Sequence, residues 1–414
     1  MANRTNKMSR NAARAAMLRA ALCCEIENHY DIAVIGGGAA GLVSAIHAAD
    51  PGHKTLLLEA DLECGKKILA TGNGRCNLTN IDLDTCHYSH PDYVAEVFQD
   101  RPYQKILEFF QSCALMCCEE QGRIYPRSLQ AASVQEVLLH KASQKDITIG
   151  CARMVQTITY DKKRAGYIIS YQEQGEKKLR KNVFARACII TTGGGVCLKM
   201  PGIDIPLTKT SPCLCALSCT TPPPKKLSGR RLSCEACLVR KNKIVACEVG
   251  EVMFRDYGLT GIAIFNLSRH AQPKDTIILN PFYDMKVEEV EAHLKLSDDL
   301  QTSLAGCIDP VIAQHIIKSR KNLNAKSCAK LLCHMEFEVS GKANIGAAQV
   351  TQGGYRPESF DPSTMMAHDY PGLFCAGEAL DIDADCGGYN LSWAWLSAMT
   401  AGTAAKTYIR SHTC

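Results

Sequence analysis

The sequence contains no run of 18 apolar residues and no hydrophobic segment of the kind found in secretory leaders. We therefore expect neither a membrane span nor a signal peptide, and we expect the protein in the cytoplasm. Aromatic residues make up only 6% of the 414 residues, and the net charge is a mild +5. This excess permits an anionic partner but does not argue for one. A hydrophobic fraction of 46% is enough for a large core in two or three domains.

Cysteine, in contrast, is abundant, with 23 residues. Without secretion, these thiols are expected to stay reduced, and most are expected to be small buried apolar side chains. One group combines C-x-C with C-x-x-C, a pattern that can bind zinc or an iron–sulfur cluster: Cys213, Cys215, Cys219, Cys234 and Cys237. Cysteines are scattered along the whole chain, so we favour structural thiols and predict no metal.

Residues 1–29 form a basic extension before the first strand. We expect this extension to be disordered or frayed, with a helix over Ala12–Cys24 as an alternative. A nucleic-acid-binding arm and a transit peptide are further alternatives.

The segment Tyr30–Glu59 is predicted to form one strand–turn–helix–strand unit. Asp31–Ile35 is a short apolar run typical of a buried parallel strand, and Ala39–Ala49 follows as a helix. Lys54–Leu58 is a second apolar run, which ends at Glu59. This order is that of a βαβ unit that binds a dinucleotide.

Three glycines, Gly36, Gly38 and Gly41, stand between this strand and helix in G-x-G-x-x-G spacing. We expect the first to permit a sharp turn, the second to let a pyrophosphate approach the backbone, and the third to allow close packing of helix on strand. The helix N-terminus offers free N–H groups to the phosphates. Glu59 is placed to accept hydrogen bonds from a ribose. The alternative is a tight turn in another α/β domain, which does not explain the acid.

Two further segments have the composition of ligand-binding loops. Ala70–Asn77 is dense in turn formers and can form neither a core strand nor a stable helix. Gly372–Glu378 is a short strand that ends at a glycine, followed by an acidic loop and the closing helix Leu391–Arg410. The only two tryptophans, Trp393 and Trp395, lie on this helix and are expected to serve packing.

An apolar strand over Ala187–Thr192 ends at Gly193 and is predicted to return to the first sheet. The chain has no second complete G-x-G-x-x-G with its own βαβ unit, so a dedicated NAD(P)H domain is not expected. Residues 198–342 are predicted to form an insert of short strands and helices, and we divide the chain into 1–29, 30–197, 198–342 and 343–414. Other expected elements are helices over Val94–Cys113, Ser133–Ser143, Glu288–Leu296 and Pro310–Cys333, strands over Ile147–Val155, Ile244–Val249, Ile262–Phe265 and Thr276–Leu279, and a turn over Val350–Tyr355.

Three blocks, namely the glycine turn, GKKILATGNGRCNLTN and AGEALDIDADCGGYNLSWAW, resemble the BaiN/YhiN-like flavoproteins, also described as the aminoacetone oxidase family of FAD-binding enzymes. The resemblance implies an α/β, two-dinucleotide-binding-domain flavoprotein with a Rossmann-like FAD domain and an inserted mixed β-barrel and helical domain. It implies that FAD is bound non-covalently. The residues expected to hold FAD are Gly36, Gly38, Ala39, Ala40, Gly41, Glu59, Ala60, Lys67, Thr71, Gly72, Asn73, Arg75, Cys76, Asn77, Val155, Gly193, Gly377, Glu378, Asp383, Gly388, Asn390 and Leu391.

Within this set, the glycine turn and Glu59 are expected at the ADP half, the second block along the flavin, and the third block at the ribityl and pyrimidine end. Flavin carries the electron chemistry, and no nucleophile and base pair stands out, so we name no catalytic residue. Cys76 has no second cysteine a few residues away, and it is expected to line the site.

The resemblance implies reduction of an activated C=C bond, in a bile-acid-type enone or in a uracil base of ribosomal RNA. NAD(P)H would then visit the flavin only transiently. Basic residues that would meet RNA phosphates are Lys225, Lys226, Arg230 and Arg231, with an ordinary solvated face as the alternative. The second hypothesis is a flavin oxidase of a small amine such as aminoacetone. The third is a flavin-binding protein without turnover.

Overall fold

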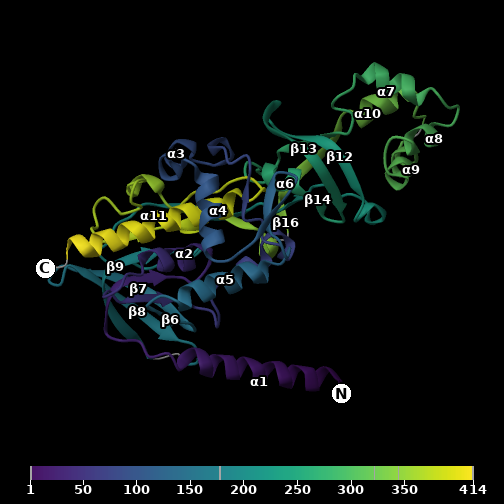
Figure 1. Ribbon diagram of the computed structural model, residues 1–414. Helices are drawn as coiled ribbons and strands as arrows, with labels where there is room; N and C mark the ends of the chain where they lie inside the picture. The colour runs from purple at the N-terminus through teal and green to yellow at the C-terminus, as the bar shows by residue number, and fades with distance from the viewer. Residues whose placement is uncertain (1, 177–178, 321, 344, 413–414) are drawn as a thin grey trace. The chain divides into compact units, whose positions relative to one another are not determined.

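The computed structural model describes residues 2–176, 179–320, 322–343 and 345–412 (Figure 1). The chain forms two compact units. Unit 1 comprises Met1–Ser211 and Gln352–Cys414, and unit 2 comprises Pro212–Thr351. The insert expected at 198–342 begins and ends earlier in the chain than unit 2. Within the described ranges, no helix has both the length and the apolar character needed to cross a lipid bilayer.

Unit 1 is built on a seven-stranded sheet in the order β6-β2-β1-β9-β8-β7, with β18 also paired to β9. The strands β6, β2, β1, β9 and β18 are parallel, and β8 and β7 extend the sheet in antiparallel fashion. Among the parallel strands, β2 and β18 are short and fully buried, as expected for strands that are covered on both faces. The bounds are β1 (His29–Ile35), β2 (Thr55–Leu58), β6 (Ile147–Gly150), β7 (Arg153–Asp161), β8 (Gly166–Glu173), β9 (Lys181–Ile190) and β18 (Leu373–Cys375).

The register of β9 brings three loops together. Ile190 lies opposite Ile35 of β1 on one edge of β9 and opposite Cys375 of β18 on the other. Because these strands are parallel, the loops that leave their carboxyl ends emerge side by side. The predicted return of the strand before Gly193 to the first sheet is therefore confirmed.

Six helices of unit 1 are described: α1 (Ala2–Leu22), α2 (Ala39–Ala48), α3 (Pro91–Phe98), α4 (Pro102–Ser112), α5 (Ala131–Ser143) and α11 (Tyr389–Ser411). The closing helix α11 lies along α2 (Figure 1). Gly402 permits this contact, since a methyl group there would lie 2.5 Å from the Ser44 carbonyl oxygen. A small three-stranded sheet completes the unit, in the order β3 (Thr79–Asn80), β5 (Arg123–Pro126), β4 (Cys117–Glu120).

The expected disorder of the N-terminal extension is wrong over Ala2–Leu22, which is helical and longer than the alternative helix predicted at Ala12–Cys24. Alanine and arginine are strong helix formers, which explains the length. The buried guanidinium of Arg153 caps the C-terminal end of α1, donating to the carbonyl oxygens of Ala21 at 3.0 Å and Cys24 at 2.6 Å.

Unit 2 contains a closed barrel in the order β11-β14-β13-β12-β15-β16, as the predicted mixed insert requires. Its strands are β11 (Ala216–Cys219), β12 (Arg231–Arg240), β13 (Lys243–Arg255), β14 (Gly258–Thr260), β15 (Thr276–Asn280) and β16 (Met335–Ala343). One apolar core joins the barrel to its helices, which are α6 (Ile262–Leu267), α7 (Val287–Leu294), α8 (Leu300–Ala305), α9 (Pro310–Ser319) and α10 (Ala325–Leu332).

Five local predictions are wrong. The strand predicted over Ile147–Val155 is two strands, β6 and β7. Ile262–Phe265 belongs to helix α6, because a short apolar run fits a buried helix as well as a strand. The expected turn over Val350–Tyr355 is strand β17, which pairs with β10 (Leu207–Cys213). The helix predicted over Val94–Cys113 is two helices, since Pro102 starts α4. The helix predicted over Pro310–Cys333 likewise divides into α9 and α10.

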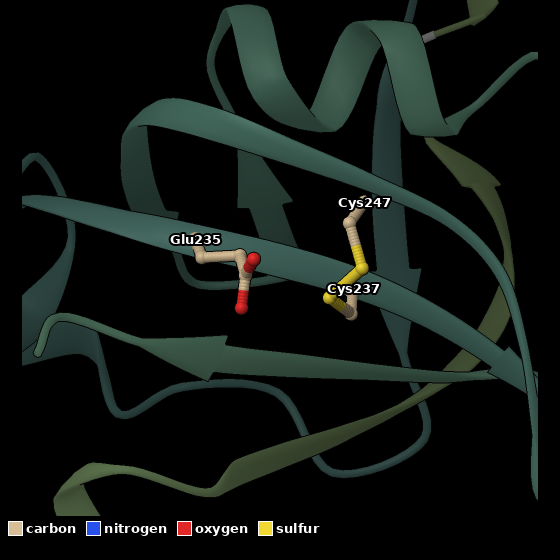
Figure 2. A group of neighbouring side chains, drawn as sticks. All are labelled: Glu235, Cys237 and Cys247. Atoms are coloured by element: carbon tan, nitrogen blue, oxygen red, sulfur yellow. A yellow bond between two sulfur atoms is a disulfide. The ribbon is translucent and has the colours of Figure 1, made fainter. Parts of the chain in front are cut away.

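The expectation that all thiols are reduced is also corrected. Cys237 and Cys247 face each other across β12 and β13 and form a disulfide. Figure 2 shows Glu235 beside this disulfide, and these three residues are the one group in the described part of the chain whose ligand atoms lie close enough for a metal ion. A disulfide offers no thiolate to a metal. Cys213, Cys215, Cys219 and Cys234 do not join this group.

Candidate cofactor site

The glycine turn after β1 is packed against the loop after β9. Gly36 has φ +105°, and a methyl group there would lie 2.5 Å from the Thr191 carbonyl oxygen. A methyl group at Gly41 would lie 1.7 Å from the Gly36 carbonyl oxygen. The turn thus requires glycine at both positions for its own packing.

Gly38 differs from these two glycines. It is the N-cap residue of α2, and a methyl group there would meet no atom of the described chain within 4 Å, its chain neighbours excepted. Open space therefore lies beside the N-cap of α2, and the first backbone N–H groups of this helix have no partner within it. This arrangement fits a pyrophosphate.

Glu59 lies at the end of β2 and is fixed by two backbone donors. The N–H of Gly37 donates to one carboxylate oxygen at 2.6 Å, and the N–H of Asp61 donates to the other at 2.7 Å. A carboxylate has about four acceptor sites, so about two remain for ligand hydroxyls. The acid thus stands beside the glycine turn, and Ala60 after it is exposed.

The C-terminal block returns to the same place. A methyl group at Gly377 would lie 2.7 Å from the β-carbon of Ala40, in the first turn of α2. The Lys67 ammonium lies 4.0 Å from a carboxylate oxygen of Glu378. A methyl group at Gly193 would lie 3.3 Å from that ammonium and 3.7 Å from that oxygen. Segments from three distant parts of the chain therefore meet here.

A second meeting point joins the second and third blocks. A methyl group at Gly388 would lie 2.9 Å from the side-chain oxygen of Asn77. This oxygen is buried and accepts no hydrogen bond from the described residues. Gly388 is the N-cap residue of α11, with φ +101°. A buried acceptor without a partner is costly, so a donor supplied by a ligand suits this position.

The loop before Asn77 has an unusual backbone. Gly72, Asn73 and Cys76 have φ values of 54°, 54° and 57°. Thr71 has an extended backbone inside the short 3-10 helical segment Ile68–Gly74. Non-glycine residues in this region carry strain that clusters at ligand sites. Gly72 and Asn73 are exposed. Cys76 is buried, and burial raises the pKa of its thiol to about 11.

Two side chains that were expected to contact FAD bind other protein groups. The Arg75 guanidinium pairs with Glu120 and lies 4.3 Å from the centre of the Tyr125 ring. The Asn390 amide accepts from the Ala384 N–H at 3.0 Å and donates to the Ala384 carbonyl at 2.8 Å, so it shapes the acidic loop.

Three more residues that were expected to contact FAD are buried or half-buried. Asp383 is only 1% exposed. Val155 is buried in β7 and lies opposite Tyr171. It follows Arg153 by two residues, and the Arg153 N–H donates to the Glu59 carbonyl. Leu391 is half-buried in the first turn of α11.

Some site-forming residues were not predicted. The Thr191 hydroxyl lies within hydrogen-bond distance of the Ile35 and Gly36 carbonyl oxygens, at 3.0 and 2.9 Å, behind the glycine turn. The Trp393 and Trp395 indoles donate to the Gly377 and Leu78 carbonyls, each at 3.0 Å. The position of Thr191 at the end of a returning parallel strand was the available signal.

Two cavities lie apart from these residues. One of about 560 Å³ in unit 2 is lined by Arg231, Tyr283 and Asp309 among others. One of about 600 Å³ in unit 1 is lined by Lys105, Met366 and Tyr408 among others. Neither is lined by an expected FAD contact.

The sequence matches the family model described as HI0933-like protein Rossmann domain over residues 30–404. This chain belongs to that family. A relative from Clostridium scindens named 3-dehydro-bile acid delta(4,6)-reductase is 31% identical over 416 residues, covering 90% of this chain and 98% of the relative. The Escherichia coli ribosomal RNA dihydrouridine synthase is 23% identical over 408 residues, covering 89% and 96%.

Solved structures also align with this HI0933-like protein. The 3-ketosteroid-delta4-(5alpha)-dehydrogenase from Rhodococcus jostii RHA1 aligns over 92% of this chain and 98% of that one, with 15% identity and a TM-score of 0.47. Family membership confirms the BaiN/YhiN-type resemblance, the Rossmann-like flavoprotein fold and the class of FAD-dependent oxidoreductase.

Proposed function

We propose that this HI0933-like protein reduces a C=C bond activated by a neighbouring carbonyl, in an enone of the steroid or bile-acid type. The observation that carries the proposal is the meeting of three loops: Gly377 packs on Ala40 in the first turn of α2, and Gly193 lies beside the Lys67 and Glu378 pair. This meeting supports one extended dinucleotide site. The relative named as a bile-acid reductase is 31% identical over nearly its whole length, and this supports the substrate class.

The residues divide the work of holding FAD. The open space at Gly38 and the N–H groups of α2 would bind the pyrophosphate, and Glu59 would accept ribose hydroxyls. Asn77 and the N-terminus of α11 at Gly388 would hold the polar edge of the flavin ring. FAD, when bound, supplies hydride transfer. The Lys67 and Glu378 pair lies beside Gly193 and would orient the groups that enter there.

Uracil in ribosomal RNA presents the same chemistry and is the competing substrate. Two of the four basic residues expected to bind RNA phosphates are already paired with acids in unit 2. Arg230 lies 3.4 Å from Asp309, and Arg231 lies 3.1 Å from Glu251. Their charge is partly neutralised, so we favour the small enone.

The test is anaerobic. The purified protein, loaded with FAD, is mixed with NADH or NADPH, and loss of flavin absorbance is followed. A panel of Δ4- and Δ4,6-3-keto steroids and bile acids is then added, and products heavier by two hydrogens are sought by mass spectrometry. Reoxidation of the flavin by an enone supports the proposal. Reoxidation only by a uracil-containing ribosomal RNA fragment contradicts the substrate class. Peroxide production from aminoacetone in air, without enone turnover, favours the amine oxidase instead.

A further inference from the structure

Two thiols lie together beside the glycine turn, although 87 residues separate them in sequence. The sulfur atoms of Cys64 and Cys151 are 3.7 Å apart. Cys64 follows β2, and Cys151 directly follows β6. These strands are parallel neighbours with Leu58 opposite Gly150, so the loops at their carboxyl ends are brought side by side.

The Cys64 sulfur packs directly against the turn that we assign to FAD. A methyl group at Gly37 would lie 2.5 Å from this sulfur and 3.1 Å from the Glu59 side chain. The Gly65 N–H donates to the Gly37 carbonyl at 2.7 Å. Cys64 is therefore packed against the glycine turn, and its sulfur also lies next to the Cys151 sulfur.

The two thiols differ in accessibility and acidity. Cys64 is 2% exposed, whereas Cys151 is partly exposed. A hydrogen bond from Cys64 lowers the pKa of the Cys151 thiol, burial and Glu59 oppose this, and Arg153 assists it. The same contact and burial raise the pKa of Cys64. Because the Cys151 sulfur is the more accessible of the two, it is the one that a small oxidant reaches first.

We propose that Cys64 and Cys151 are a modification site, a dithiol that hydrogen peroxide converts to a disulfide and whose oxidation is coupled to occupancy of the adjacent dinucleotide turn. The Cys151 thiolate attacks one peroxide oxygen, the O–O bond breaks, and hydroxide leaves and is protonated to water. The Cys64 sulfur then attacks the Cys151 sulfenic acid, the S–O bond breaks, and a second water leaves with the Cys64 proton. Overall, two thiols and one peroxide give one disulfide and two waters.

The coupling follows from the geometry and rests on the proposed FAD site. Disulfide formation requires the sulfur atoms to close from 3.7 Å to about 2.05 Å. The Cys64 sulfur packs against Gly37 and near Glu59, the groups that the bound nucleotide would immobilise, so holding these groups in place opposes the closure. FAD binding and disulfide formation therefore oppose each other in free energy, and by linkage the disulfide weakens FAD binding. We also expect bound FAD to slow the oxidation, because it holds these groups in place.

Trypsin makes the first experiment direct, because each cysteine falls alone in its own peptide. Residues 55–66 contain only Cys64, and residues 146–153 contain only Cys151. The full chain is treated with hydrogen peroxide, alkylated, digested without reduction and measured by mass spectrometry. We expect the 55–66 and 146–153 peptides to be linked in most molecules. The linked species should be absent in Cys64→Ser and Cys151→Ser, and unchanged in Cys113→Ser, which removes a buried thiol at the end of α4. Absence of the linked peptides from the wild-type chain overturns the proposal, and this result needs no variant to fold.

The second experiment measures the coupling. We expect FAD to slow linkage, and the linked protein to bind FAD about fivefold more weakly or worse, with recovery after reduction by a thiol. Equal linkage rates with and without FAD overturn the coupling. If no FAD binds to either form while the linked peptides appear, the proposed cofactor is wrong but the dithiol stands. If FAD binds and no linkage occurs, the dithiol is wrong but the proposed function stands.

Discussion

Adding one methyl group should destabilise the chain at Gly41 but have little effect on stability at Gly38, although both glycines belong to the same turn. At Gly41, the methyl group would lie 1.7 Å from the Gly36 carbonyl oxygen, so backbone must move. Overpacking costs about 1–3 kcal/mol and more where backbone is displaced, so Gly41→Ala should lower the free energy of unfolding by about 3 kcal/mol or more. At Gly38, the methyl group meets nothing within 4 Å in the described chain, and φ −74°, ψ −160° suits alanine. Gly38→Ala should therefore change stability by about 1 kcal/mol or less.

FAD affinity should be lowered by Gly38→Ala, the variant that leaves stability nearly unchanged. If the pyrophosphate lies at Gly38, the new methyl group blocks its approach to the α2 N–H groups. Loss of hydrogen bonds to a charged group costs about 1.5–3 kcal/mol, which is an affinity loss of about 10- to 150-fold. Urea unfolding of the FAD-free chain and fluorescence titration with FAD measure the two quantities separately. Wild-type FAD affinity in a folded Gly38→Ala protein would refute the assigned pyrophosphate position, and wild-type stability of Gly41→Ala would refute the packing of the turn.

Four further predictions follow from other contacts. Lys67→Met should weaken FAD binding or slow flavin reduction without shifting the melting temperature, because the side chain is 73% exposed. The control Lys66→Met loses only the surface pair with Asp61 and should affect neither FAD binding nor flavin reduction. Stopped-flow absorbance compares the two variants. Arg153→Met should lower the free energy of unfolding in urea by about 3 kcal/mol and make α1 accessible to trypsin, because it removes a buried guanidinium that binds Glu173 and the carbonyls at the end of α1. Arg164→Met, which removes an exposed guanidinium paired with Asp161, is the control. Trp395→Phe leaves the buried Leu78 carbonyl without its donor and should cost about 1–3 kcal/mol, measured by thermal unfolding; an unchanged midpoint contradicts the contact. The free energy of unfolding should fall as the pH rises above 9. In the unfolded chain the thiols ionise at their ordinary pKa of 9.0, whereas in the folded chain burial raises the pKa of Cys76 and Cys219 to about 11. A urea midpoint at pH 10 equal to that at pH 8 contradicts this sign.

The sequence predicted which segments meet because parallel strands leave their loops at one edge. Knowing that Ile35, Ile190 and Cys375 end apolar runs is enough to expect Gly36, Gly193 and Gly377 near each other. This reasoning does not extend to short apolar runs. Ile262–Phe265 has no periodicity long enough to distinguish a strand from a helix, and its helical state is set by packing on β13.

Polar side chains were less predictable than the backbone that carries them. Asn390 and Arg75 sit in the expected blocks, but each is satisfied by a near neighbour, the Ala384 backbone and Glu120 respectively. The Asn390 amide bonds to nearby backbone, whereas the Arg75 guanidinium pairs with an acid 45 residues away, and composition reveals neither partner. The Cys64 and Cys151 pair was missed for a related reason, since it arises only from the register of β2 on β6.

The closing helix α11 connects these observations. Its N-terminus at Gly388 faces Asn77, and its tryptophans bind the Leu78 and Gly377 carbonyls in two different site loops. Leu78 directly precedes β3, and Gly377 has φ +69°, so rigid indole donors from one buried helix fix the two segments together. The helix also packs on α2, which carries the phosphate end of the proposed site. One C-terminal helix therefore fixes the two ends of the site relative to each other. We infer that disturbing α11 should weaken FAD binding even where no cofactor contact is removed.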